Sequence, residues 1–375
     1  MAKRLTVVVS QGQSHNPAKR NLEEDLVAAL LFEPNIEVTI VPHLYDLKPD
    51  GPGILGLQSI TSDFVVVSWN FERATRWTLD RNNIRGREGT TLLVREPDDD
   101  DELEDELEDE TSEDKTRVID HRELPNRLIY CIDFRVSNDV TTYVAEIKRI
   151  QQELSTPVVQ LGGLGTNGTA TNGAPTNGKP ADHRITPEQR ARFDQPTNDT
   201  ALGENGQLES PIPIHEPIRL EETSGRRWYP VIDYSRCTNC MECIDFCLFG
   251  VYGVDGAETI LVEIPDNCRK GCPACSRVCP ENAIIFPQHK SPTIAGSPEV
   301  SAGGMKVDLS LLFGKPQESA DAVDTALRER DEQLLLAGRD AVGDSVGAPR
   351  RQREKQAGPK DDLDALIDAV DELDV

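Results

Sequence analysis

Residues 237–280 read CTNCMECIDFCLFGVYGVDGAETILVEIPDNCRKGCPACSRVCP and hold eight of the nine cysteines of this chain. The cysteines form two runs with nearly the same spacing, Cys237-x2-Cys240-x2-Cys243-x3-Cys247 and Cys268-x3-Cys272-x2-Cys275-x3-Cys279. Apolar residues precede and follow each run, at 231–234 and 249–254 for the first and at 261–265 and 283–286 for the second. The segment therefore predicts a duplicated unit of strand, cysteine loop, short helix and strand.

The spacing of these cysteines is typical of iron–sulfur coordination. Short gaps of two residues let one tight loop present three thiolates, and in a two-cluster protein the last cysteine of each run reaches the other cluster. Over residues 227–290 the pattern resembles the bacterial-type two-[4Fe–4S] ferredoxins. The resemblance implies that a first cluster is bound by Cys237, Cys240, Cys243 and Cys279, and a second by Cys268, Cys272, Cys275 and Cys247.

Two features of the runs depart from the ferredoxin pattern. Leu248 follows Cys247 where that family usually has a proline, which shapes a turn and binds no metal. The gap of three residues after Cys268 lengthens the second loop, so a labile or three-iron second cluster is an alternative. No spare cysteine lies nearby, which favours Cys268 as a ligand after all. Zinc and disulfides fit less well, because zinc sites usually use two separated cysteine pairs and disulfides need an oxidising compartment.

The composition limits the partners and the location of the protein. Of its 375 residues 37% are hydrophobic, which is below the globular norm, so part of the chain is not expected to fold alone. A formal net charge of −26 argues against nucleic acid or an anionic membrane as the main partner. The sequence has no apolar run of membrane-spanning length, and the apolar stretch at 5–9 is too short for a secretion signal. We therefore expect a cytoplasmic protein.

Residues 1–154 predict one three-layer α/β domain. Apolar, strand-like runs occur at 5–9, 38–41, 64–67, 91–94 and 128–132, and helical patterns near 17–30, 71–81 and 137–150 separate them. Alternating strands and helices imply a doubly wound, flavodoxin-like sheet. Within an insertion at 97–115, nearly every residue from 98 to 114 is acidic, which predicts a disordered, solvated loop and not a metal site.

The first loop of this domain follows the carboxyl end of a strand, where such sheets bind ligands. Small and polar residues at the start of the following helix suit a phosphate, and the loop offers Ser10, Gly12, Ser14 and Asn16. Because the loop lacks the nucleotide fingerprints, FMN binding and a plain strand–helix connection both stay open. Trp69, Asn70 and Trp77 either line the same crevice or pack inside the domain. Cys131 is expected to be a small buried hydrophobe.

The remaining segments predict connections and one docking motif. Residues 155–226 predict a flexible linker, of low complexity and rich in glycine, threonine, asparagine and proline up to 207, whereas the apolar character of 211–220 predicts a stretch that packs back onto one domain. The tail at 291–375 predicts disorder with short helices, one of them near 318–336. At 361–374 apolar residues fall on one helical face among aspartates, so this helix either docks on a partner or frays as a functionless tail.

These patterns predict an electron carrier or subunit more than an enzyme, since no catalytic triad or nucleotide fingerprint is present. The first hypothesis is an iron–sulfur protein with two [4Fe–4S] clusters that serves redox partner proteins as a tethered ferredoxin or electron-transfer subunit. One alternative is an iron–sulfur flavoprotein oxidoreductase with FMN in the N-terminal domain. Another is a cluster-stabilised structural or redox-sensing interaction protein. Cations beside the second run are expected to raise the potential of that cluster, namely Arg269, Lys270 and Arg277.

Overall fold

The computed structural model describes residues 4–93, 115–155, 216–223, 225–297 and 322–347. All of these residues belong to one compact unit of the chain. The acidic run at 98–114, the predicted linker up to residue 215 and the predicted docking helix at 361–374 lie outside the described residues.

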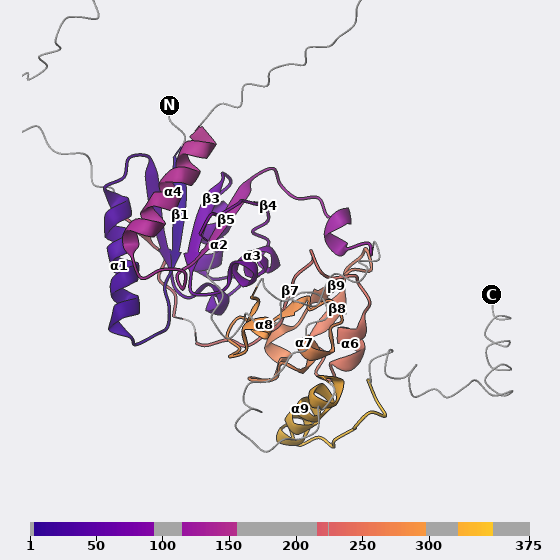
Figure 1. Ribbon diagram of the computed structural model, residues 1–375. Helices are drawn as coiled ribbons and strands as arrows, with labels where there is room; N and C mark the ends of the chain where they lie inside the picture. The colour runs from indigo at the N-terminus through magenta and orange to yellow at the C-terminus, as the bar shows by residue number, and fades with distance from the viewer. Residues whose placement is uncertain (1–3, 94–114, 156–215, 224, 298–321, 348–375) are drawn as a thin grey trace, which may run out of the picture. The chain divides into compact units, whose positions relative to one another are not determined.

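A parallel β-sheet forms the core of the N-terminal part (Figure 1). Its strands lie in the order β4-β5-β3-β1-β2-β6, and every pairing is parallel. Their bounds are Arg87–Glu88 for β4, Leu128–Asp133 for β5, Phe64–Ser68 for β3, Leu5–Ser10 for β1, Ile36–Val41 for β2 and Ile218–Arg219 for β6. Val7, for example, lies between Val38 and Val65. Such runs of β-branched residues suit strands that are buried on both faces.

Four helices cover the two faces of this sheet. α1 (Pro17–Leu31) and α4 (Val140–Ser155) pack beside each other and share one apolar core with one face of the strands. α2 (Pro52–Ser59) and α3 (Glu72–Arg81) contribute to the core on the opposite face. The prediction of a parallel-sheet α/β domain is confirmed, whereas a flavodoxin-like identity stays a prediction.

Two sequence predictions differ from the structure. Residues 91–93 form no strand, because the edge strand β4 comes earlier and the following chain turns toward α4. There the Leu92 N–H donates to the Glu146 carboxylate at 2.8 Å, and the Leu92 side chain is 65% exposed. Ile218 and Arg219, inside the predicted linker at 155–226, pair with β2 as strand β6, and Leu220 packs against the apolar core. This placement agrees with the expectation that the apolar stretch at 211–220 packs back onto one domain.

The cysteine segment contains two small antiparallel sheets and two short helices. Its strands are β7 (Val231–Ile232), β8 (Tyr252–Val254), β9 (Ile260–Val262) and β10 (Ile284–Ile285), and its helices are α6 (Glu242–Phe246) and α7 (Ala274–Val278). β7 from the first half pairs with β10 from the second, and β8 pairs with β9. Each of the two sheets therefore pairs a strand of the first half with a strand of the second half.

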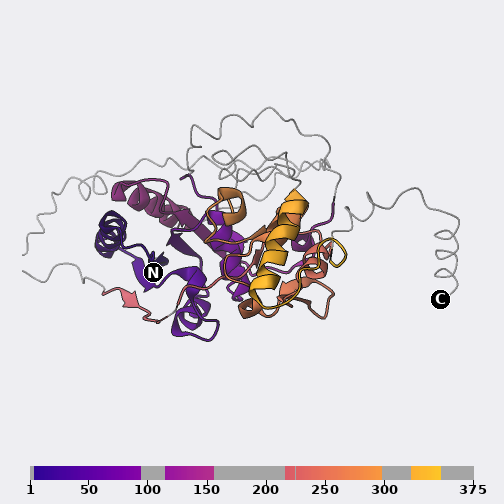
Figure 2. The ribbon, with the colours of Figure 1, turned by 90° about the horizontal axis from the view of Figure 1, so that it is seen from below.

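Two further helices follow the cysteine segment, α8 (Pro292–Ala295) and α9 (Ala322–Leu336). α9 lies within the range predicted near 318–336. It packs against α7, and Figure 2 shows it lying along the cysteine segment. Its Ala326 and Leu327 are buried in the same apolar core as Cys237 and Cys275. The described part of the tail is therefore folded onto the cysteine segment.

Side chains from the loops after β2 and β3 join the sheet to the cysteine segment. Tyr45, in the 3-10 helix η1 (Leu44–Asp46), stacks on Tyr229 with ring centroids 4.2 Å apart. Arg73 of α3 forms an ion pair with the buried Asp233 of the cysteine segment. Because the loops after β2 and β3 lie at the carboxyl end of the parallel sheet, the cysteine segment is packed where such sheets usually bind ligands.

Glu72, the first residue of α3, gives the N-terminal part a pH-dependent stability. Burial and then the negative charge of Asp133 raise the pKa of Glu72 to about 7. Because folding favours the protonated form, this contribution to stability is fully present below about pH 4.5 and is lost as the pH rises through about 7. We expect Glu72→Gln to raise the apparent melting temperature at pH 8 by about 2–4 °C, the shift that ~1 kcal/mol produces in a folded unit of about 150–250 residues.

The same variant should melt closer to wild type at pH 4.5, because Glu72 is then protonated in the folded state and about half protonated in the unfolded state. Glu24→Gln, on the exposed surface of α1, is the control and should leave both melting temperatures unchanged. A gain at pH 4.5 as large as that at pH 8 would contradict the electrostatic explanation.

Candidate metal centre

The first cysteine cavity lies beside β7 and α6. It is bordered by Cys237, Cys240, Cys243 and Cys279, and by the apolar side chains of Ile232, Ile260 and Ile284. Asn239 and Met241 have φ angles of 60° and 63°, so the backbone between the first three cysteines winds in the left-handed region. This tight winding is how one short loop can present three sulfur atoms to a common centre.

The second cavity is bordered by Cys247, Cys268, Cys272 and Cys275, together with the apolar side chains of Phe246, Phe249 and Val251. Gly271 takes up the extra residue of this loop, since its φ of 88° is one that glycine adopts without strain. Cys268 therefore reaches the same cavity as the other three cysteines. The hydroxyl of Tyr252 donates to Cys275 Sγ at 3.1 Å.

The last cysteine of each run lies at the cavity of the other run. Cys247 ends α6, and Cys279 ends α7. These two helices are in contact, and the cysteine that follows each helix borders the cavity of the other run. The two groups of four that the ferredoxin resemblance implies are the groups that the structure brings together.

The thiols of each group lie close enough to influence one another. Burial raises the pKa of Cys243 well above its usual value, and charge on Cys279, Cys237 and Cys240 raises it further. Burial likewise raises the pKa of Cys275, and charge on Cys247, Cys268 and Cys272 adds to the effect. For Cys237 and Cys272 burial raises the pKa to about 11. Without metal these thiols are therefore protonated at neutral pH, and a bound cluster must displace their protons.

Each cavity offers four cysteine thiols, the donor set that iron–sulfur clusters use. All nine cysteines are free thiols. Among the described residues no three His, Cys, Asp or Glu side chains are placed to hold one metal ion. In a [4Fe–4S] cluster each thiolate binds a different iron, so the sulfur atoms surround the cluster without converging on one point.

The charged residues near the second cavity differ in part from those predicted. Arg269 and Lys270 are exposed. Arg277 is buried but forms an ion pair with Glu329 of α9, with Nε 3.0 Å from the carboxylate. Sequence analysis missed Arg330, which borders the cavity from α9. Its position depends on the fold of the tail, so no local sequence pattern could have assigned it.

The polar groups of the predicted phosphate loop are hydrogen-bonded to other groups of the protein. The Gly12 N–H donates to the Glu23 carboxylate at 2.7 Å, and Trp69 Nε1 donates to the same carboxylate. Asn16 caps α1 by accepting a hydrogen bond from the Ala18 N–H, and Ser14 Oγ accepts one from the Asn16 N–H. The Glu23 carboxylate thus accepts the hydrogen bond of the Gly12 N–H, a backbone donor that a bound phosphate would need.

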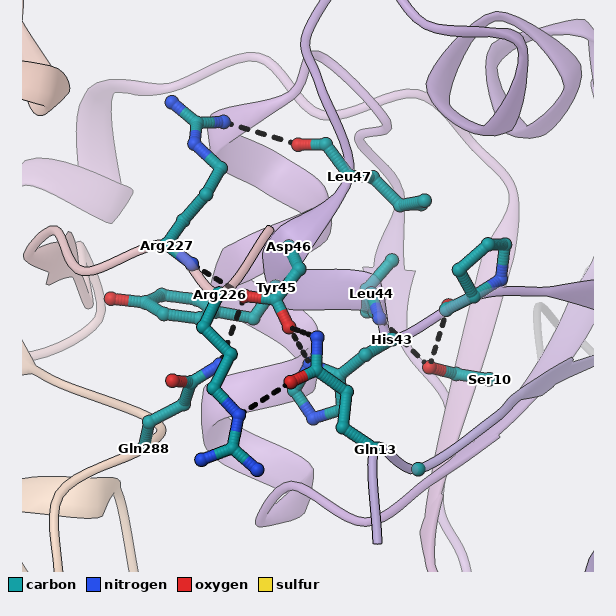
Figure 3. Close-up of polar contacts among 12 residues, drawn as sticks. Ser10, Gln13, His43, Leu44, Tyr45, Asp46, Leu47, Arg226, Arg227 and Gln288 are labelled. Atoms are coloured by element: carbon teal, nitrogen blue, oxygen red, sulfur yellow. Dashed lines mark hydrogen bonds and ion pairs between the residues drawn. The ribbon is translucent and has the colours of Figure 1, made fainter. Parts of the chain in front are cut away.

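Ser10 and the neighbouring Gln13 connect this loop to η1 and to the cysteine segment (Figure 3). Ser10 Oγ accepts from the Leu44 N–H at 2.9 Å, and Gln13 donates to the fully buried Asp46. Asp46 also accepts from the Arg227 N–H and from Gln288 Nε2, at 2.8 and 2.9 Å. Asp46 is therefore the acceptor through which the first loop, η1 and the cysteine segment are held together.

The other singled-out residues pack within the protein, and Trp77 does so at the junction with the cysteine segment, where its ring centroid lies 5.7 Å from that of Tyr234. Trp69 stacks on Phe134 with centroids 5.1 Å apart, and Trp77 and Asn70 are 5% and 4% exposed. Cys131, in the middle of β5, is 7% exposed and packs in the core beneath α2 and α3. It borders neither cysteine cavity.

Two antiparallel sheets, two short helices and two crossed groups of four cysteines are features expected of a two-cluster ferredoxin segment. The chain is 52% identical over 66 residues to an uncharacterised ferredoxin of Methanocaldococcus jannaschii. The match covers 17% of this chain and 44% of that protein, so the chain spans less than half of the relative's length. No protein-family model and no solved structure matches the chain. The similarity supports the presence of a ferredoxin-like segment.

None of the helices in the described ranges is both long enough and apolar enough to cross a membrane.

Proposed function

We propose that this chain is an iron–sulfur electron-transfer protein whose cysteine segment binds two [4Fe–4S] clusters. The observation that carries the proposal is the pair of cavities, each bordered by four cysteines, with the last cysteine of each run at the other cavity. The similarity to a protein named as a ferredoxin supports it. When bound, each cluster supplies one-electron transfer.

The side chains and backbone around each cavity would control how readily its cluster is reduced. In the first cavity the N–H groups of Asn239 and Ala283 donate to Cys237 Sγ and Cys279 Sγ, at 3.4 and 3.2 Å. Such hydrogen bonds stabilise the additional negative charge of the reduced state, whereas apolar walls that exclude water disfavour it. The balance between these effects sets the working potential.

The chain would serve redox partner proteins as a carrier or as an electron-transfer subunit in the cytoplasm, with a ferredoxin domain at about 227–290 and an α/β domain at 1–154. The flavoprotein alternative is weaker, because the Glu23 carboxylate holds the Gly12 N–H and would repel a phosphate group. No comparable observation favours a purely structural or sensing role.

Analysis of anaerobically purified protein for iron, acid-labile sulfide and flavin tests the proposal. We expect about eight irons and about eight sulfides per chain, as two [4Fe–4S] clusters require. The visible spectrum should show broad absorption without resolved flavin bands. Stoichiometric zinc without sulfide would refute the proposal, and bound flavin would support the flavoprotein alternative.

A further inference from the structure

Arg330, in α9, is a buried cation beside the second cysteine cavity. It is 1% exposed and borders this cavity together with Cys247, Cys268, Cys272 and Cys275. Its guanidinium carbon lies 4.8 Å from the centre of the Phe246 ring. The side chains that border the first cavity include Glu281, which pairs with the half-exposed Lys115, but neither arginine nor lysine. The two cavities therefore differ in the charge placed beside them.

The contacts of Arg330 fix its guanidinium and include one carboxylate, that of Asp331. Nη1 donates to the Val346 carbonyl at 2.9 Å, and Nη2 donates to the Gly343 carbonyl. Nε lies 3.2 Å from a carboxylate oxygen of Asp331, whose side chain is 16% exposed and also accepts from the Gly343 N–H. Two of the three partners are thus neutral carbonyl groups, and the single carboxylate is partly in contact with water.

The other cations near the second cavity are placed less effectively. Arg269 and Lys270 are exposed, where water screens their charge. Arg277 is buried and paired with the Glu329 carboxylate, and it does not border the cavity. Arg330 is therefore, among the described residues, the buried cation at the wall of the second cavity.

We propose that Arg330 raises the reduction potential of the second cluster above that of the first, so that an electron accepted by the protein from a one-electron reductant comes to rest on the second cluster. Reduction adds one negative charge to a cluster, and a buried positive charge beside it stabilises that state. The inference rests on the proposed function, since it assumes that both clusters are bound. It also gives α9, which lies beyond the ferredoxin-like residues 227–290, a role in setting the direction of electron flow.

A mediated redox titration of the full-length, anaerobically purified protein, followed by electron paramagnetic resonance, tests this proposal. In Arg330→Gln the equilibrium constant for reduction of the second cluster should fall about tenfold, a shift of about 59 mV for one electron. Arg330→Lys, which keeps the charge, should stay near wild type. Asp331→Asn removes the compensating carboxylate and should shift the second cluster in the opposite direction, about threefold in favour of reduction. The first cluster is the internal control in each variant.

The outcomes separate the inference from the function on which it rests. Protein without acid-labile sulfide would refute the two-cluster function itself. With both clusters present, an equal shift of the two potentials in Arg330→Gln, or a shift of the same size in Arg330→Lys, would overturn the role of Arg330. If Arg330→Gln loosens α9, the test rests on Asp331→Asn. In that variant a fall in the reduction potential of the second cluster, or no change in it, contradicts the proposal. Arg269→Gln, at the exposed rim of the cavity, should have a smaller effect than Arg330→Gln.

Discussion

Replacement of Cys240 by alanine is expected to remove the first cluster and leave the second. Cys240 borders the first cavity with three other cysteines, so its loss leaves one iron without a thiolate ligand. The second cavity has its own four cysteines. Bound iron should fall from about eight to about four per chain, and one of the two signals in the electron paramagnetic resonance spectrum of the reduced protein should disappear.

Cys131→Ala is the matched control for this experiment. Cys131 is a free thiol like the others, but it lies in β5, packs in the core of the α/β part and borders neither cavity. Both cluster signals should persist in this variant. If Cys131→Ala loses a cluster, or if Cys240→Ala loses both, the assignment of ligands to two separate groups is wrong.

The largest expected effect on stability comes from Tyr45→Ala at the junction of the sheet and the cysteine segment. Tyr45 is fully buried and stacks on Tyr229, whose N–H donates to the Tyr45 hydroxyl at 2.6 Å. The Tyr229 hydroxyl in turn donates to the Tyr45 carbonyl. Truncation would leave a cavity and an unpaired buried N–H, for which we expect a loss of ~3–5 kcal/mol in the free energy of unfolding.

Urea unfolding under anaerobic conditions measures this loss. Tyr45→Phe keeps the ring and removes the hydroxyl, so it should lose only about 1–3 kcal/mol. Phe32→Ala removes an aromatic side chain that is 64% exposed and should change stability by less than about 0.5 kcal/mol. Equal unfolding of Tyr45→Ala and Phe32→Ala would show that the junction contributes little to stability.

The grouping of the cysteines was the most predictable feature of the chain, because it follows from short spacings that the sequence displays directly. The predicted groups of four coincide with the two cavities, although the crossing of Cys247 and Cys279 came from the ferredoxin resemblance and not from spacing alone. The long gap after Cys268 left open whether this cysteine is a ligand; in the structure Cys268 borders the second cavity, and Gly271, within that gap, has a φ of 88°.

The junction and the contribution of the tail could not be predicted, because they depend on contacts between residues far apart in sequence. Asp46 had no distinguishing local pattern, yet it is a fully buried acceptor for Arg227 and Gln288. Arg330 in an otherwise ordinary helix gave no sign that it borders a cysteine cavity. The strand expected at 91–94 failed for a related reason, since an apolar run does not reveal whether it pairs in the sheet or turns toward a helix.

The exchange of strands between the two halves of the cysteine segment has a consequence for its origin. β7 pairs with β10 and β8 with β9, and the last cysteine of each half borders the cavity of the other half. A single half would have neither a complete sheet nor a complete set of four ligands. If the segment arose by duplication, two separate copies of the ancestral half could have folded only as a symmetric pair, with identical surfaces facing each other. Fusion of the two copies then freed each half to diverge, and a charge beside one cavity no longer had to be repeated beside the other.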